Sequence, residues 1–419
     1  MHTSLPPLKI VRDGLHRATE ALARELARPG STTPEWSDME WQLAAAAAAA
    51  HGVAPLLSRY LPWQEPAWRA FVRSQSEHVE LRHRRIIELL ASIDASTRAA
   101  GIAVIPLKGC ALHAIGLYAP GERPMADIDL LVHEEDLEQT GALLCALGYV
   151  QSFTQWKHQV FKPTASTFFA GLGEHRDTPI NIELHTRIQE RLPIAVVDIT
   201  EQVYPGTPTP GLNAYPSSGA LMAHLLLHAA GNICGHSMRL LHLNDISLLA
   251  TRMTPRDWNV LWEANSGKPP WWALPPLYMV SRYYTHAVPR SVLARLQRDC
   301  PTLLQTLSRR RTLTHVSCSA LWLNALPGIE WSRSPSEAIR CIIQRFRPTA
   351  ESVKERADMV RTQLWLQGQN WVTASHARRI LTRLIRPVPR MDTLYAVRAA
   401  FEHFGNNRSS PDASTPSAG

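Results

Sequence analysis

The chain has 419 residues, of which 45% are hydrophobic and 19% are charged, and its formal net charge is +8 at pH 7. This composition is typical of a globular protein with a full hydrophobic core, and it excludes a disordered or collagen-like chain. The six cysteines are scattered without a CxxC pair, which indicates neither a zinc site nor a disulfide framework.

Residues 1–100 are predicted to be a helical region. Its first residues lack the apolar stretch of a signal peptide, and the alanine-rich run 43–50 is too short to span a bilayer. This run favours helix because alanine has the highest helix propensity, and apolar residues at helical spacing continue over 67–101. We therefore expect a cytoplasmic protein with no stable association with a membrane.

The character of the chain changes at Gly101, and residues 101–203 are predicted to form a small α/β core. An apolar, β-branched segment after Gly101 predicts a buried strand, and 127–132 predicts a second one. An amphipathic helix with acidic residues in its first turn follows and ends at Gly148. Further strands are expected at 149–153, 158–162 and 179–185.

Residues 204–218 are rich in Pro, Gly, Ser and Thr, which predicts a linker. Helical periodicity returns over residues 219–405, and the polar tail 406–419 is predicted to be disordered. Residues 290–390 carry 18 basic and 6 acidic side chains, so they could meet a phosphate-bearing partner, although solvated helix faces are the simpler interpretation. The predicted fold class is α+β, a small mixed-sheet core flanked by N-terminal and C-terminal all-helical regions.

The segment RPMADIDLLV, residues 123–132, places two aspartates on a short strand that is otherwise apolar. Asp127 and Asp129 stand two apart, so the period of a strand directs both carboxylates to one face. Two carboxylates on one face repel each other unless a cation lies between them. Magnesium takes oxygen ligands and leaves room for the phosphates of a substrate. Glu183, on the polar face of a later strand, is the expected third carboxylate of a two-metal site.

A candidate phosphate cradle precedes this strand. A strand runs into Lys108, Gly109 and Cys110, where a helix is expected to begin. A glycine lets the backbone approach a phosphate, a helix N-terminus offers free N–H groups, and the lysine can neutralise charge. Arg123 could neutralise charge from the loop. Each feature alone is often structural, so the order of the features along the chain carries the prediction.

That order resembles the nucleotidyltransferase superfamily with the DNA polymerase β-like fold. Its signature is a Gly-Ser turn that opens a helix, then Asp-x-Asp on the next strand, and a later carboxylate. Cys110 stands where that superfamily usually has serine, and the interval from Gly109 to Asp127 is longer than in compact members. Within the superfamily, the chain is most similar to the bacterial "uncharacterised nucleotidyltransferase" family over roughly residues 50–390. The motifs that carry this similarity are HGVAPLL (51–57), LKG (107–109), RPMADIDLLV (123–132), IELH (182–185) and RLLHLNDISLL (239–249).

The resemblance implies a magnesium-dependent nucleotidyltransferase that moves an NMP from an NTP, with ATP as the expected donor, and releases pyrophosphate. The acceptor is unidentified and could be a small molecule, a peptide or protein side chain, or an RNA end. The expected catalytic and metal-binding residues are Asp127, Asp129 and Glu183. The expected nucleotide-binding residues are Lys108, Gly109, Cys110 and Arg123, the last of them at the leaving pyrophosphate. His185 shares the strand face of Glu183 and could orient a metal ligand.

Two other functions stay open at this point. The main alternative is a non-catalytic nucleotide-binding or adaptor protein of a biosynthetic or defence operon. Against it, a domain without catalysis has no reason to retain three carboxylates. The other is RNA end modification guided by the basic C-terminal helices.

Several further residues allow both a structural and a functional interpretation. His224 and His228 lie four apart on one helix face without the intervening Glu of a zincin motif. Helix packing is therefore the simpler interpretation, with a place in a cleft as the other. Asp245 is expected to pair with Arg239. The tryptophans of the C-terminal region are expected to anchor helix packing rather than to stack on a base.

Overall fold

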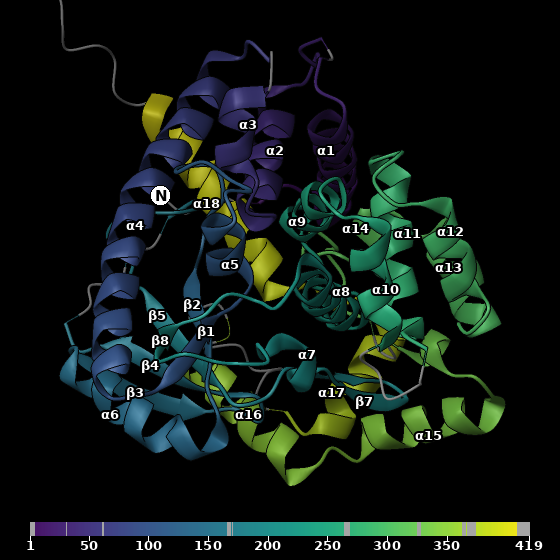
Figure 1. The fold of residues 1–419 in the computed structure, drawn as a ribbon. Helices are drawn as coiled ribbons and strands as arrows, with labels where there is room; N and C mark the ends of the chain where they lie inside the picture. The colour runs from purple at the N-terminus through teal and green to yellow at the C-terminus, as the bar shows by residue number, and fades with distance from the viewer. Residues whose placement is uncertain are drawn as a thin grey trace, which may run out of the picture.

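The computed structural model describes residues 5–30, 32–60, 63–165, 169, 171–263, 269–324, 328–362, 366 and 374–408. A six-stranded sheet lies among helices that come from both ends of the chain (Figure 1). Its strands are β1 (Ala103–Pro106), β2 (Asp127–Leu131), β3 (Tyr149–Thr154), β4 (His158–Pro163), β5 (Asn181–His185) and β8 (Gly211–Leu212).

The sheet is mixed, and its strand order is β3-β4-β5-β2-β1-β8. The pairs β2–β5 and β1–β8 are parallel, whereas β1–β2, β3–β4 and β4–β5 are antiparallel. The two central strands β2 and β5 pair with Asp129 opposite Glu183. A separate hairpin of β6 (Gln189–Leu192) and β7 (Ala195–Asp198) follows β5. The register therefore joins the two strands that carry the predicted carboxylates.

The two faces of the sheet meet different surroundings. Ile128, Leu130 and Val132 are fully buried in a core that the sheet forms with α4 (Pro66–Ala99) and α6 (Leu137–Ala146). Because side chains alternate along a strand, the carboxylates of β2 face the other side. On that side the hairpin β6–β7 packs against α8, which runs from Ser218 to Gly235.

Helices from the two ends of the chain share one hydrophobic core. The C-terminal helix α18 packs on α2, whose alanine run is buried because α1 packs on it as well (Figure 1). The N-terminal helices are α1 (Leu8–Ala27), α2 (Asp38–Ala50) and α3 (Ala54–Tyr60). The later helices are α5 (Lys108–Ala114), α7 (Thr200–Val203), α9 (Leu240–Ala250), α10 (Pro255–Glu263), α11 (Leu274–Tyr283), α12 (Arg290–Gln297), α13 (Thr302–Arg310), α14 (Leu313–Val316), α15 (Pro335–Phe346), α16 (Ala350–Thr362), α17 (His376–Ile385) and α18 (Met391–Arg408).

The predicted fold class, α+β with a mixed sheet and helical regions before and after it, is confirmed. The division into domains stays a prediction, and two of its segments contain structure that was not expected. The predicted linker 204–218 contains β8, which pairs with β1 and forms the edge of the sheet. The helix α18 continues to Arg408, and residues 409–419 of the predicted tail lie outside the described part of the chain. Within the described residues, no helix is both long and apolar enough to cross a bilayer.

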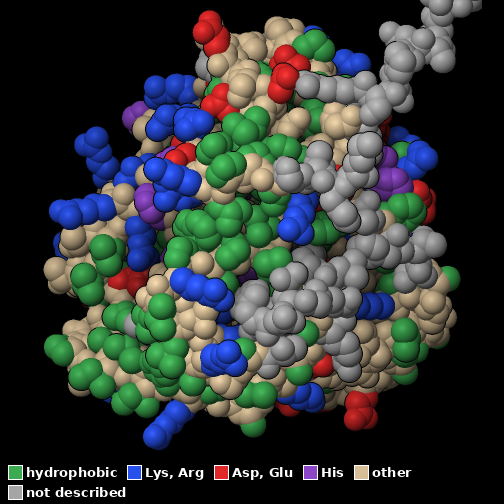
Figure 2. All heavy atoms as spheres, turned by 180° about the vertical axis from the view of Figure 1, so that it is seen from behind, with side chains coloured by type: hydrophobic (Ala, Val, Ile, Leu, Met, Phe, Trp, Pro, Cys, Tyr) green, Lys and Arg blue, Asp and Glu red, His purple; other side chains and the backbone are tan. Residues whose placement is uncertain are grey.

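The basic C-terminal region is spread over several short helices. Figure 2 shows Lys and Arg side chains distributed over the rear face among hydrophobic ones, not gathered in one patch. A groove of about 660 Å³ between α15 and the hairpin β6–β7 is lined by three arginines of this region, Arg340, Arg345 and Arg347. This groove is a place where the positive charge of the region does gather.

A buried ion pair fastens the loop before β2 to the helix α9. Nε and Nη2 of Arg123 donate to the two carboxylate oxygens of Asp245, each at 2.8 Å, and the hydroxyl of Tyr118 donates to Asp245 at 2.7 Å. The side chains of the pair are only 8% and 2% exposed. The predicted pair of Asp245 with Arg239 is wrong, because both oxygens of the carboxylate accept from Arg123.

His51 of the HGVAPLL segment makes a second buried connection to α9. Its Nδ1 accepts a hydrogen bond from the backbone N–H of Leu240 at 2.9 Å, and its Nε2 lies 2.7 Å from Oγ of Ser319. Burial, aided by the charge of Arg239, lowers the pKa of His51 to about 3. The neutral imidazole thus joins the end of α2 to the start of α9.

We expect Asp245→Ala to lower the free energy of unfolding by about 3–5 kcal/mol, because it leaves the buried guanidinium of Arg123 without a counter-charge. Urea unfolding followed by circular dichroism measures the loss. The matched control is Glu80→Gln, which removes the exposed i,i+4 partner of Arg84 and should change stability by less than about 0.5 kcal/mol. Equal losses in the two variants would contradict a structural role for the buried pair.

We also expect acid to destabilise the protein through His51. Its folded pKa of about 3 lies below the ordinary 6.5, so between these values the unfolded chain binds the extra proton. Stability therefore falls as the pH falls through this window, by up to roughly 1.4 kcal/mol per pH unit for one histidine. Urea unfolding at pH 7.5 and pH 5 should show a shallower dependence for His51→Gln than for the wild type. An unchanged slope in His51→Gln would refute the assignment.

Candidate active site

The structure brings the three predicted carboxylates together on the face of the sheet that lies opposite α4. Asp127 and Asp129 project from β2, and Glu183 projects from the parallel strand β5 at the register position of Asp129. The side chains of Asp129 and Glu183 are 7% and 23% exposed, and Asp127 is half-buried. The alternation in DIDLL and NIELH produces this arrangement, because the intervening apolar side chains occupy the opposite core.

Three carboxylates on one face make ionisation costly. Desolvation, followed by the charges of Asp129 and Glu183, raises the pKa of Asp127 to about 7. Burial acts upward on Asp129 too, but Lys108 and His185 outweigh it and hold the pKa of Asp129 well below its usual value. An additional cation would relieve the repulsion that remains. The three oxygen donors therefore fit a hard divalent cation such as Mg²⁺.

Lys108 reaches these carboxylates from a strained turn. Its φ of +46° lies in the left-handed region, which residues with a side chain rarely adopt and which is enriched at functional sites. Its Nζ donates to Oδ1 of Asp129 at 2.8 Å. Burial lowers the pKa of Lys108, but the charges of Asp129, Glu183 and Asp127 raise it further, so the ammonium stays charged. The turn thus places a cation between the carboxylates and the cavity described below.

The other predicted phosphate-binding residues face inwards. A Cβ atom on Gly109 would lie 2.4 Å from Nη1 of Arg123, so this glycine makes room for the buried arginine. The thiol of Cys110 is buried, which raises its pKa to about 12, and its backbone N–H already donates to the carbonyl of Leu107. Arg123 is bound to Asp245. Neither Cys110 nor Arg123 lines the cavity, so the geometry does not support a phosphate contact from either side chain.

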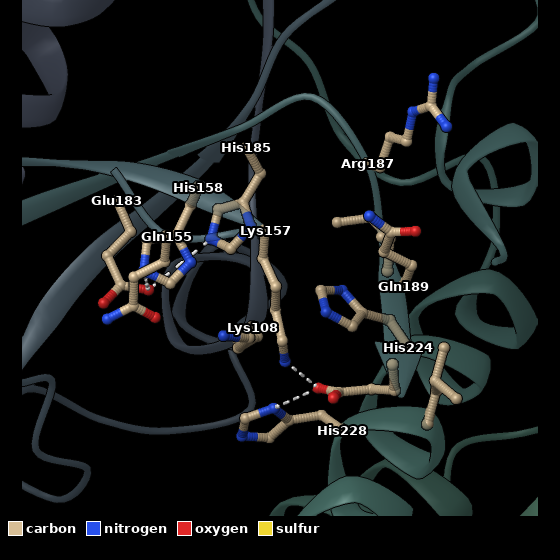
Figure 3. A pocket seen from close by; sticks show the side chains of 13 residues that line it. Lys108, Gln155, Lys157, His158, Glu183, His185, Arg187, Gln189, His224 and His228 are labelled. Carbon is tan, nitrogen blue, oxygen red and sulfur yellow. Dashed lines mark hydrogen bonds and ion pairs between the residues drawn. The ribbon is translucent and has the colours of Figure 1, made fainter. Parts of the chain in front are cut away.

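A cavity opens between the sheet, the hairpin β6–β7 and α8 (Figure 3). Glu183 lines this cavity, whereas Asp127 and Asp129 do not. Lys157 donates to Glu190 at 2.5 Å, and Nδ1 of His228 lies 3.8 Å from the same carboxylate. His224 and His228 both line this cavity, so the face of α8 that they share borders a cleft. Arg187 also lines it, with a side chain that is 57% exposed. The lining is therefore rich in side chains that can bind an anionic substrate.

His158 is a residue of the cavity that the sequence interpretation missed. It stands on β4 opposite His185 in register, and the two imidazole centroids are 4.8 Å apart. Its Nε2 lies 3.5 Å from Oε2 of Glu183. Nε2 of His185 donates to Oδ1 of Asp129 at 3.0 Å. The strand that contains His158 was predicted from the sequence. The contact of His158 with Glu183 was not, because it depends on the pairing of β4 with β5, which are separated by a long connection.

Arg82 of α4 holds the starts of both site strands. Its guanidinium donates to the carbonyls of Met125 at 3.0 Å and Ala126 at 2.8 Å, just before β2. It also donates to the carbonyls of Thr178 and, at 3.1 Å, of Pro179, just before β5. The residue is only 1% exposed. A single buried side chain therefore ties together the segments that lead into the two strands that carry the carboxylates.

Comparison with known proteins gives one match. Residues 37–268 match the model of a protein family described as uncharacterised nucleotidyltransferase, and this range is more than half of the chain. No curated protein and no solved structure matches the chain. The matched range contains β2, β5, the turn of Lys108 and the helix α8 that borders the cavity.

We expect Arg82→Met to lower the free energy of unfolding by roughly 2–4 kcal/mol, because the apolar side chain leaves buried carbonyl groups without donors. Urea unfolding measures the change. Arg84→Met, two residues further along the same helix, removes a side chain that is 63% exposed and should cost less than about 0.5 kcal/mol. A similar small cost for Arg82→Met would show that the strands do not depend on it.

Proposed function

Because the chain belongs to the family of uncharacterised nucleotidyltransferases, we propose that it transfers an NMP from an NTP to an acceptor and releases pyrophosphate. In this reaction an oxygen of the acceptor forms a bond to the α-phosphorus, the bond from that phosphorus to the β-phosphate breaks, and the acceptor loses its proton. The observation that carries the proposal is the meeting of three carboxylates from two neighbouring strands with a charged lysine that lines a cavity together with Glu183.

Asp127, Asp129 and Glu183 are the residues that we propose hold divalent cations, with Mg²⁺ as the expected ion and two ions as the expected number. Such ions, when bound, neutralise phosphate charge and stabilise the attacking and leaving oxygens. Glu183 and Asp129 stand opposite each other on neighbouring strands. The side chain of Glu183 is the more exposed of the two, at 23% against 7% for Asp129. It is therefore the better placed of these two to accept the proton of the acceptor.

Positive charge for the triphosphate comes from the cavity lining in this proposal. The ammonium of Lys108 lies at its edge, and its attraction to Asp129 keeps it charged. Lys157 and Arg187 line the same cavity and take the role that the sequence suggested for Arg123. The expected donor remains ATP, and nothing in the lining distinguishes one base from another.

A groove beside the cavity supports an anionic acceptor. Gln189 and Glu190 of β6 line the cavity, while the next residue, Arg191, lines the groove with the three arginines of the C-terminal region. The hairpin thus separates the two depressions by the width of a strand. An acceptor with phosphate groups, such as an RNA end, is the class that this charge favours. A non-catalytic nucleotide-binding or adaptor protein remains the alternative function.

The test uses the full-length protein with each NTP labelled on the α-phosphate, Mg²⁺ and fractions of a cell lysate as the source of acceptor. We expect label transfer to an acceptor, and we expect Asp129→Asn or Glu183→Gln to reduce it at least about 100-fold. Removal of divalent cations with EDTA should stop transfer, and added Mg²⁺ should restore it.

Glu201→Gln is the matched control, because Glu201 is exposed and does not line the cavity. Unchanged label transfer by Asp129→Asn would contradict the assignment of Asp129 to the active site. Magnesium-dependent binding of nucleotide without any transfer would favour the adaptor function.

A further inference from the structure

A second set of donors, which includes nitrogen, lies beside the aspartate pair. Nε2 of His158 is 3.5 Å from Oε2 of Glu183, and Nε2 of His185 is 3.7 Å from the same oxygen. One donor atom from each residue lies within 4.8 Å of the other two. Figure 3 shows the three side chains pointing toward one another from β4 and β5. Their position follows from the register, because His158 pairs with His185 and Glu183 is two residues earlier on the same strand.

His158 gives a separate reason to expect a ligand. Its side chain is only 8% exposed, yet neither ring nitrogen has a hydrogen-bond partner among the described residues. A buried polar atom normally finds a partner, since leaving one unbonded is costly. Nε2 of His185, by contrast, donates to Asp129, and His185 would give up this proton and hydrogen bond on binding an ion. A ligand between the two strands would satisfy His158.

The spacing and the chemistry of the trio fit a metal ion. Donors that lie about 2.0–2.2 Å from a tetrahedral metal are separated from one another by about 3.3–3.6 Å. The two measured separations of 3.5 and 3.7 Å are close to that range. Imidazole nitrogens favour first-row transition ions, whereas Mg²⁺ takes oxygen ligands almost exclusively.

We propose that His158, Glu183 and His185 bind one first-row transition divalent cation, of the class of Mn²⁺ or Zn²⁺, beside the Asp127–Asp129 pair. The proposal deepens the proposed function, because Glu183 belongs to both donor sets, but binding of the ion does not require turnover. The local charge favours a cation, since three carboxylates face one lysine on this side of the sheet. The protein would then prefer a transition ion to Mg²⁺ at one of its two positions.

The test is direct binding of Co²⁺, used as a spectroscopic probe, to full-length protein freed of metal with EDTA. We expect one strongly bound Co²⁺ with visible ligand-field absorption, not displaced by an equal concentration of Mg²⁺. His158→Gln should weaken Co²⁺ binding at least about 10–100-fold. Binding of Mg²⁺, followed by calorimetry, should change by less than about twofold in the same variant. His228→Gln is the matched control, because it removes another cavity histidine outside the trio.

A second variant keeps the proposal testable if His158→Gln does not fold. His158→Cys retains a ligand and should add a sulfur-to-cobalt charge-transfer band in the near ultraviolet, which appears only when residue 158 contacts the ion. Equal Co²⁺ affinity in the wild type and His158→Gln, or absence of the new band in folded His158→Cys, would overturn the site.

Failure of the proposed function gives a different result. In that case no NTP label is transferred with any cation, while the binding of Co²⁺ still depends on His158. If Mg²⁺ supports transfer but Co²⁺ does not bind, or binds His158→Gln as tightly as the wild type, the proposed function stands and the transition-metal site is refuted.

Discussion

The repulsion among Asp127, Asp129 and Glu183 is the constraint around which the core is built. Parallel pairing of β2 with β5 places Asp129 and Glu183 side by side on a surface that is largely out of water. Two energetically costly features of the core lie beside these carboxylates. The left-handed backbone at Lys108 brings a compensating charge to these groups, and the buried Arg82 ties together the segments that lead into the two strands.

Three of the family motifs meet at α9, two of them through contacts of Arg123 and His51 with this helix. Arg123 of RPMADIDLLV binds Asp245 of RLLHLNDISLL, and His51 of HGVAPLL accepts from the N–H of Leu240 in the same segment. These polar groups are buried, so each specifies one partner where an apolar contact would accept many. The motifs therefore contain residues of two kinds, those that can do chemistry and those that orient the helices around the sheet.

The strand period was sufficient to predict which side chains of DIDLL and NIELH share a face, because that property is local. The α+β class followed for the same reason. Contacts between distant segments were not accessible in this way. Arg123 was assigned to phosphate because its position beside the aspartates was visible, whereas its partner Asp245 is 122 residues away. His158 was missed because its neighbours on β5 are separated from it by the connection between the strands. The strand β8 was not predicted, because it has only two residues and lies in a Pro- and Gly-rich segment whose composition indicates a linker.

The packing of α18 on α2 has a consequence for how the chain is made. The alanine face of α2 is completed by residues 391–408, which leave the ribosome after all the other described helices and strands. Until then the first helices lack a covering layer, while the α/β core has all its strands once residue 212 has emerged. The centre of the sequence can thus fold during synthesis, and closure of the helical body must wait until residues 391–408 have emerged. Contacts over such sequence separations also slow folding, so the nascent protein passes through a stage with a formed sheet and an exposed N-terminal surface, on which chaperones can act.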